Sequence, residues 1–394
     1  MSKREVVVVS AVRTAVGDFG GALKDVPPTR LGALVLADAI ARAGVDPASV
    51  GHVFFGHVIN TEPRDMYLSR VAAVEAGLPK ETVAANVNRL CGSGLQAIIS
   101  ASQAILLGDT DVAVGAGAES MSRAPYVLPG QRWGARMGDA KVIDMMTGAL
   151  SDPFDAVHMG VTAENVAARY EVSRTDQDAL ALESHRRAAR AQAEGRFKSQ
   201  VLPIEITVKR KPVMFEVDEH VRADVSAESL AGLKTVFKKD GSVTAGNASG
   251  LNDGAGAVVL MEATAAARAG ATPLARLVAY AHAGVEPLYM GIGPVPASRK
   301  ALERAGLKVA DMDVIEANEA FAAQACAVSK ELGLDPAKVN PNGSGISIGH
   351  PIGATGAIIT TKAIHELHRI GGRYALVTMC IGGGQGIAAI FERA

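Results

Sequence analysis

Residues 39–44, Ala-Ile-Ala-Arg-Ala-Gly, followed after eight residues by Val53, are the stretch that decides the fold, because the chain contains them twice. Residues 301–306, Ala-Leu-Glu-Arg-Ala-Gly, are again followed after eight residues by an apolar residue, Ile315. The same helix, turn and strand are therefore predicted twice, 262 residues apart. The sequence predicts two similar halves that face each other.

A second pair of segments supports this repeat at nearly the same offset. Residues 91–94, Cys-Gly-Ser-Gly, open one predicted helix, and residues 350–353, His-Pro-Ile-Gly, open another. Each of these two segments follows a turn rich in Asn and Gly. Short apolar runs alternate with helical stretches, which predicts the α/β class with largely parallel sheets; these runs are Val6–Val9, Val53–Phe55, Val112–Val114, Val258–Met261, Val314–Ile315 and Ala375–Thr378.

Residues 121–250 differ in composition from both halves. They contain the single tryptophan, Trp133, a group of methionines and a charged helix. The helix is predicted to begin at Ser173, with Asp176 completing a capping box, and to end near Gly195. We interpret this segment as an insertion that covers one face of the first half and binds the non-reacting part of a substrate.

The composition excludes several classes of protein. The 394 residues suffice for two or three domains with a large core. The 40 Lys and Arg against 41 Asp and Glu leave a net charge of −1, which argues against a nucleic-acid partner. The one oddity is the 42 glycines, about 11% against a usual ~7%.

The three cysteines are widely spaced, at Cys91, Cys326 and Cys380, so they predict free thiols rather than a disulfide framework or a zinc site. No apolar run long enough for a signal peptide or a membrane span is evident, and the C-terminus has no targeting tripeptide. We therefore expect a cytoplasmic protein with no membrane partner and no metal.

Cys91 is the first candidate for chemistry. It stands directly before an apolar-periodic stretch that ends at Gly108, and so near a helix N-terminus. Unsatisfied N–H groups and the helix dipole there stabilise a thiolate, so we expect a pKa below the usual ~8.5. Small residues at 92–94 leave room for a substrate. A buried structural cysteine is the alternative.

His350 is predicted at the second helix start, where Pro351 suits the first turn of a helix that runs to about Arg369. A neutral imidazole beside a thiol is the usual base that activates a nucleophilic cysteine. A cap or surface histidine is the alternative, and only the pairing with Cys91 favours catalysis.

Cys380 lies at the end of a predicted strand that runs into the glycine turn at residues 382–386. Such a turn lets backbone approach a ligand and present N–H groups to an oxyanion; a phosphate loop is the weaker alternative, since no P-loop Lys follows. Cys326 is predicted in the core. Asn318 is either a turn residue or a polar group that points into a site between the halves. Ser249 is either a turn residue or a donor to a ligand that carries amides.

Four blocks in this order resemble the thiolases, most closely the short-chain biosynthetic β-ketothiolases (acetyl-CoA acetyltransferases) of polyhydroxyalkanoate-making bacteria. The blocks are Asn88-Arg-Leu-Cys-Gly-Ser-Gly, Asn318-Glu-Ala-Phe, Gly349-His-Pro-Ile-Gly-Ala-Thr-Gly and Cys380-Ile-Gly-Gly-Gly-Gln-Gly. The resemblance covers nearly the whole chain. One departure, Gly343-Ser-Gly345 where many thiolases have Gly-Gly-Ala, bears on subtype only.

The resemblance implies the thiolase fold, an α/β fold of two similar βαβαβαββ halves that form a five-layered αβαβα core with an inserted loop domain. It implies an N-terminal half of residues 1–120 plus 251–271, a loop domain of residues 121–250 that covers coenzyme A (CoA), and a C-terminal half of residues 272–394. It also implies a homotetramer, a dimer of dimers, that uses CoA thioesters as substrates and binds no permanent cofactor.

The resemblance further implies a β-ketothiolase that condenses acetyl-CoA with acetyl-CoA or a short acyl-CoA by ping-pong chemistry. Cys91 would take the acyl group, His350 would activate it, and Cys380 would remove the α-proton of the second thioester. Asn318, through a water, and His350 would form one oxyanion hole, and the N–H groups of Cys91 and Gly382 the other. Matching substrate and CoA positions are Ser249, Arg222, His158, Met159, Leu150 and Ala248, with Met290, Phe237 and Phe321 along the acyl pocket.

Three alternatives remain open at this point. A ketoacyl synthase has a related fold but expects a second catalytic histidine where this chain has Asn318, and it has no use for Cys380. An acyl-CoA-binding protein without turnover needs neither thiol. A cysteine amidase or protease could use Cys91 and His350 but would have no need of Cys380.

Overall fold

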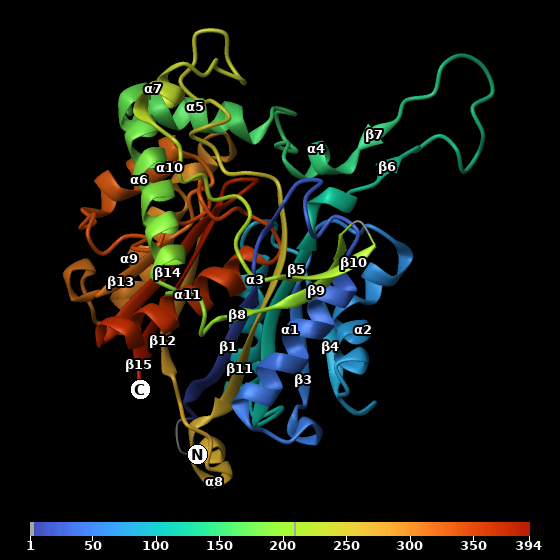
Figure 1. Ribbon diagram of the computed structural model, residues 1–394, viewed down its shortest axis with the longest axis vertical. Helices are drawn as coiled ribbons and strands as arrows, with labels where there is room; N and C mark the ends of the chain where they lie inside the picture. Colours follow the sequence, from blue (N-terminus) through green and yellow to red (C-terminus); the bar gives the residue numbers. More distant parts are fainter. Residues whose placement is uncertain (1–3, 209) are drawn as a thin grey trace.

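The computed structural model describes residues 4–208 and 210–394, and Figure 1 shows the two halves side by side. The first half runs through β1 (Val6–Thr14), α1 (Pro28–Ala43), β3 (His52–Gly56), α2 (Leu68–Glu75), β4 (Val83–Val87), α3 (Ser93–Leu107), β5 (Val112–Ser120) and β11 (Asn252–Glu262). The second half runs through β12 (Ala275–Gly284), α9 (Pro294–Ala305), β13 (Val314–Ala317), α10 (Ala322–Leu332), α11 (Thr355–Ile370), β14 (Tyr374–Ile381) and β15 (Gln385–Arg393). Between the halves lies α8 (Ala263–Ala269).

The predicted repeat is confirmed in three dimensions. In the first half, α1 ends at Gly44 (φ 65°) before β3, and in the second, α9 ends at Gly306 (φ 66°) before β13. Both glycines adopt the left-handed conformation that closes a helix without a Cβ penalty. The halves differ at the third strand, because the counterpart of β4 is reduced to one parallel bridge between Ile315 and Val339.

The prediction of largely parallel sheets is only half right. In the first half β4, β3, β5 and β1 share one direction, but β11 is antiparallel and lies between β5 and β1. The second half repeats this order with β13, β14, β15 and β12. In the second half, β15 follows β14 without a crossover helix. In the first half, β11 follows β5 only after the long insertion. The periodicity of apolar runs therefore does not indicate the direction of either strand.

The elements stack in five layers, as expected. Helix α1 packs on one face of the first half's strands, and α9 packs on the outer face of β12 and β15. Helices α3 and α11 contact each other and lie between the two sets of strands (Figure 1). Apolar clusters fill each interlayer space; the central one joins α3, α11 and both sets of strands through residues such as Ile98, Ile364 and Val377. The two halves therefore share one core.

Glycines bring the central layer into backbone contact. A Cβ on Gly94, in the first turn of α3, would lie 2.8 Å from the backbone nitrogen of Ala357 in α11. A Cβ on Gly356 would collide with the backbone of Leu95, and one on Gly117 of β5 would lie 2.5 Å from the carbonyl oxygen of Gly353. Side chains cannot be accommodated at this junction, so the two helix N-termini meet through bare backbone.

The inserted segment packs on both halves rather than on the first alone, which corrects our interpretation. Helix α6 (Arg174–Ala193) has the predicted capping box of Ser173 and Asp176. It contacts α10 of the second half, while its later residue Ala188 joins the first half's core. The remaining elements are β2 (Gly17–Asp18), which precedes the insertion, and within it β6 (Tyr126–Val127), β7 (Ile143–Asp144), α4 (Met145–Ala149), α5 (Met159–Arg169), β8 (Val201–Leu202), β9 (Ile204–Val208), β10 (Lys211–Phe215) and α7 (Ala227–Ala231).

One segment, Leu90–Leu107, is long and apolar enough to cross a membrane by composition alone, contrary to our expectation that none is. It consists of the Cys91 turn and α3, and 61% of it is buried in the structure. The apolar character of α3 follows from its position in the central layer, where sheets cover both sides.

Candidate active site

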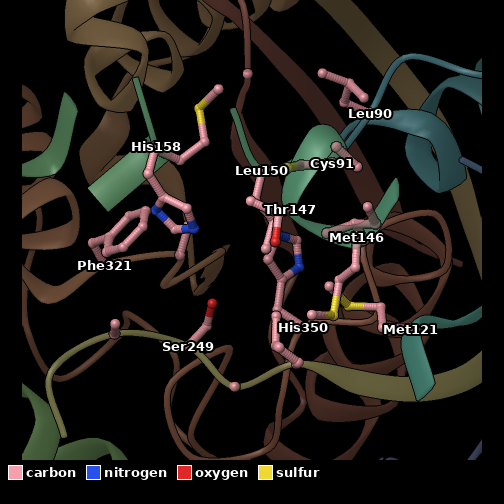
Figure 2. Close-up of a pocket in the computed structure, with 18 of the residues that line it drawn as sticks. Leu90, Cys91, Met121, Met146, Thr147, Leu150, His158, Ser249, Phe321 and His350 are labelled. Carbon is pink, nitrogen blue, oxygen red and sulfur yellow. The ribbon is translucent and has the colours of Figure 1, made fainter. Parts of the chain in front are cut away.

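A cavity of about 380 Å³ lies where the two halves and the inserted segment meet (Figure 2). Cys91, His350, Cys380 and Gly382 all line it. So do eight of the residues matched to substrate binding, namely Leu150, His158, Met159, Phe237, Ala248, Ser249, Met290 and Phe321. The lining is mostly apolar with a few polar groups, which is usual for a pocket that binds a small molecule.

Cys91 is placed by the turn that precedes α3. Leu90 has a positive φ of 44°, which is unusual for a residue with a branched side chain. The hydroxyl of Ser93 donates to the carbonyl of Leu90 (2.6 Å) and accepts from the backbone N–H of Arg89 (2.8 Å). These bonds hold the strained turn and present Cys91, which is half-buried, to the cavity.

The predicted low pKa of Cys91 is wrong. Burial raises the pKa of the Cys91 thiol to about 11, and the nearby charge of Glu119 acts in the same direction. The backbone N–H groups of Gly382 and of Cys91 itself oppose the rise by favouring the thiolate. Desolvation therefore outweighs the helix N-terminus, and the thiol carries its proton at neutral pH.

His350 is held at its backbone and at its ring. Its backbone N–H donates to Oδ1 of Asn252 (2.8 Å), and its Nδ1 lies 2.7 Å from Oγ1 of Thr355. The α-helix begins at Thr355, later than predicted, because residues 351–354 form a separate turn. Burial lowers the pKa of His350 to about 4, so the imidazole is neutral above that pH.

Asn318 follows β13 and reaches the same ring. Its backbone N–H donates to the carbonyl of Thr378 in β14 (3.0 Å). Its amide nitrogen lies 3.4 Å from Nε2 and 3.5 Å from Nδ1 of His350, and its Oδ1 is buried without a protein partner within the described residues. Asn318 thus has an oxygen free to bind a water beside the imidazole.

Cys380 is fully buried near the end of β14, before the glycine turn at residues 382–384. Burial raises the pKa of its thiol, and the proximity of Cys91 raises it further. Gly384 has φ 82° and packs against the backbone of Val285, so the turn is fixed in shape. A Cβ on Gly382 would meet Leu90 and Met159 at 3.1 and 3.3 Å, beside the cavity.

The opposite wall of the cavity is aromatic. His158 is the N-cap of α5, with Nδ1 accepting from the N–H of Gly160, and its ring stacks on Phe237 at 4.7 Å between centroids. Phe237 meets Phe321 edge to face at 6.3 Å. Figure 2 shows His158 and Phe321 across the cavity from Cys91 and His350.

Of the nine residues matched to substrate binding, Arg222 alone does not line the cavity. It is exposed, and its backbone N–H donates to Nδ1 of His185. Cys326, predicted in the core, is half-buried and lines a different cavity between α6 and α10.

Sequence reasoning missed Glu119 at the end of β5. Its carboxylate is fully buried and accepts from the backbone N–H groups of Val58 (3.1 Å), Ile59 (3.2 Å) and Gly353 (2.9 Å). It therefore ties the His350 turn to the first half. An acidic residue at the end of an otherwise apolar strand was the available signal. Within the described residues, no group of three or more His, Cys, Asp and Glu side chains could hold a metal ion.

The arrangement can perform acyl transfer. A thiol, a neutral imidazole, a second thiol and two backbone N–H groups converge on one apolar cavity. Such a set supplies a nucleophile, a base and donors for an oxyanion.

Comparison with known proteins agrees with this chemistry. The family models described as thiolase N-terminal domain and thiolase C-terminal domain match residues 6–264 and 271–393. Beta-ketothiolase BktB of Cupriavidus necator is 69% identical over 391 residues, 99% of each chain. The crystal structure of acetyl-CoA acetyltransferase from Bacillus anthracis superposes with a TM-score of 0.97 at 49% identity, covering 100% of this chain and 99% of that one. The crystal structure of human mitochondrial 3-ketoacyl-CoA thiolase in complex with CoA superposes with a TM-score of 0.96 at 45% identity, covering 99% of this chain and 98% of that one.

The raised pKa of Cys91 predicts its reactivity with a small alkylating reagent. With a pKa of about 11 the thiolate fraction rises about tenfold per pH unit, so the alkylation rate by iodoacetamide should climb from pH 6 to 9 without a plateau. Peptide mass mapping separates Cys91 from Cys326, the internal reference. A plateau at Cys91 with a midpoint below pH 8 would show a preformed thiolate and contradict this account.

Proposed function

Because the chain belongs to the thiolase family, we propose that it carries the acyl group of its reaction on Cys91. The protein is an acyltransferase of the β-ketothiolase type, which reversibly condenses acetyl-CoA with acetyl-CoA or a short acyl-CoA. The observation that carries the residue assignment is the convergence of two thiols and one imidazole on a single cavity.

The first half-reaction forms a Cys91 thioester. The sulfur attacks the thioester carbon of acetyl-CoA while the Cys91 proton moves to Nε2 of His350. The bond between the acyl carbon and the CoA sulfur breaks, and the thiol of Cys380 gives its proton to the leaving CoA thiolate. The neutral state of both groups, with pKa values of about 11 and about 4, requires this transfer to accompany attack.

Two sets of donors stabilise the charge that develops on oxygen. The N–H groups of Cys91 and Gly382 favour negative charge on the Cys91 sulfur in the free protein, so they suit an oxyanion at the adjacent acyl carbon. Protonated His350, with a water held by Asn318, suits the enolate oxygen of the second thioester.

The second half-reaction closes the proton balance. The Cys380 thiolate removes the α-proton of the second acetyl-CoA, and the enolate carbon attacks the Cys91 thioester. The carbon–sulfur bond to Cys91 breaks, and His350 returns its proton to the Cys91 sulfur. Each group ends in its starting state, so one active site serves both half-reactions.

The substrate is proposed to lie between the aromatic wall and the catalytic groups. We assign CoA contacts inside the cavity to Ser249, His158, Met159, Leu150 and Ala248, and a CoA contact outside it to the exposed Arg222. We assign the acyl pocket to Phe237, Met290 and Phe321. A relative of the same fold has been crystallised with CoA, which supports thioester substrates. We propose no permanent cofactor, a cytoplasmic location, and the domain division at residues 120, 250 and 271.

Single thiol substitutions separate the two half-reactions. Cys91→Ser is expected to abolish covalent labelling by radioactive acetyl-CoA, because no thioester can form. Cys380→Ser should retain labelling, because a CoA thiolate can leave without the proton of Cys380. It should lose condensation by at least about 10²-fold, since the α-proton has no base. Cys326→Ser, in the other cavity, is the control. Labelling that survived in Cys91→Ser would overturn the assignment.

We propose further that the chain assembles as a homotetramer, a dimer of dimers. Strand β4 is an unpaired sheet edge with Val83 half exposed, which suits pairing with a second copy. The β6–β7 hairpin projects from the body (Figure 1) and exposes 86% of Trp133 and 95% of Met137. Large apolar side chains so exposed favour contact between protein copies.

The hairpin can be tested by sedimentation velocity. Replacing Trp133 and Met137 by Ser is expected to convert a tetramer into a dimer, because the hairpin loses its apolar contact area. Leu107→Ser, at a position 80% exposed at the end of α3, should leave the tetramer intact. A wild-type dimer or monomer, or a tetramer that survives the double substitution, would contradict the proposal.

A further inference from the structure

We propose that Thr355 is a positioning residue that keeps the hydrogen of the His350 imidazole on Nδ1, leaving Nε2 as the base. The inference rests on the proposed function, since it concerns how His350 accepts the proton of Cys91. Thr355 does not line the cavity, and its side chain reaches the catalytic groups through its contact with His350.

The first observation is the contact between the two side chains. Oγ1 of Thr355 lies 2.7 Å from Nδ1 of His350, and both residues are at least 96% buried. A buried ring N–H without an acceptor costs about 1–3 kcal/mol, so the hydroxyl oxygen decides which nitrogen can carry the hydrogen.

The second observation is where the hydroxyl hydrogen goes. Oγ1 of Thr355 donates to the carbonyl of Pro351, four residues earlier, at 2.9 Å. A hydroxyl has one hydrogen and two lone pairs, so the oxygen that donates to Pro351 can only accept from Nδ1. The ring nitrogen facing Thr355 is therefore the N–H nitrogen, and Nε2 holds the free lone pair.

Other threonines of the same helix support this direction of donation. Thr360 donates to the carbonyl of Gly356 at 2.7 Å, and Thr361 donates to that of Ala357 at 2.9 Å. Donation to the carbonyl four residues back is a common arrangement for a helical threonine. Thr355 makes the same bond at the start of α11 and uses its remaining lone pair for the histidine.

The third observation is the rigidity of this position. Thr355 is followed by Gly356, whose backbone is in contact with Gly94 and Leu95 of α3. The branched side chain has few rotamers in a helix. The oxygen is therefore fixed relative to Cys91, which stands three residues before Gly94.

Asn318 does not compete for the lone pair of Nε2. Its amide nitrogen lies at nearly the same distance from both ring nitrogens, 3.4 Å from Nε2 and 3.5 Å from Nδ1, which is too long and too poorly directed for a good hydrogen bond to either. In the opposite tautomer Nε2 would carry a hydrogen and could not take the proton of Cys91.

The test combines a spectrum of the wild type with three variants of the full-length protein. A ¹⁵N–¹H correlation spectrum of histidine-labelled enzyme, with His350→Asn to assign the signal, is expected to show a protonated Nδ1 and an unprotonated Nε2 at pH 7. Thr355→Val should lower the rate of Cys91 acetylation about 10–100-fold at little changed KM and redistribute the hydrogen between the nitrogens. Thr355→Ser should restore both. Thr360→Val, the matched control, should behave as wild type.

The outcomes separate this inference from the proposed function. A wild type in which Nε2 carries the hydrogen overturns the role of Thr355, even if Thr355→Val does not fold. So does a folded Thr355→Val that acetylates at the wild-type rate. If wild-type Cys91 is not acetylated at all while the spectrum shows hydrogen on Nδ1, the proposed function fails and the tautomer assignment stands.

Discussion

The backbone contact between the N-termini of α3 and α11 is the constraint on which the rest of the structure depends. At Gly94 and Gly356 the two helices approach so closely that neither position has space for a Cβ. The contact brings together the segments that precede each helix, and these segments carry Cys91 and His350. Part of the glycine excess therefore lies where two copies of one helix–turn–strand unit must touch.

This packing also sets the electrostatics of the cavity. Because two layers of strands and the inserted segment enclose the helix N-termini, desolvation dominates every titratable group there. It raises the pKa of both thiols and lowers that of His350. The helix N-terminus favours a thiolate but is the smaller effect. Neutral groups that line one cavity can exchange a proton during attack without a buried ion pair in the resting state, whose desolvation would be costly.

Much of the fold could be predicted because it depends on local signals. The paired helix stops at Gly44 and Gly306, the capping box at Ser173 and the position of Cys91 before α3 are all features of short segments. The reversed direction of β11 and β15 and the packing of α6 on both halves depend on distant contacts, so apolar periodicity could not show them. The pKa of Cys91 was missed for the same reason.

The same distinction between local signals and distant contacts applies to the residues of the site. Spacing and residue type indicated Cys91, His350 and Cys380, whereas the cavity wall of Phe237 and Phe321 came from family resemblance alone. Glu119 and Thr355 act through hydrogen bonds to residues far away or within a turn, and a sequence does not display such bonds.

The central claim is that the glycine contact brings Cys91 and His350 into one cavity, where Nε2 takes the thiol proton during attack. The most direct measurement is a crystal structure of the enzyme with CoA bound, in which the distance from Cys91 Sγ to His350 Nε2 is read. The account predicts hydrogen-bond reach, about 3.5 Å for a thiol and a ring nitrogen. A separation of more than about 5 Å, with α3 and α11 still in contact at Gly94 and Gly356, would contradict it.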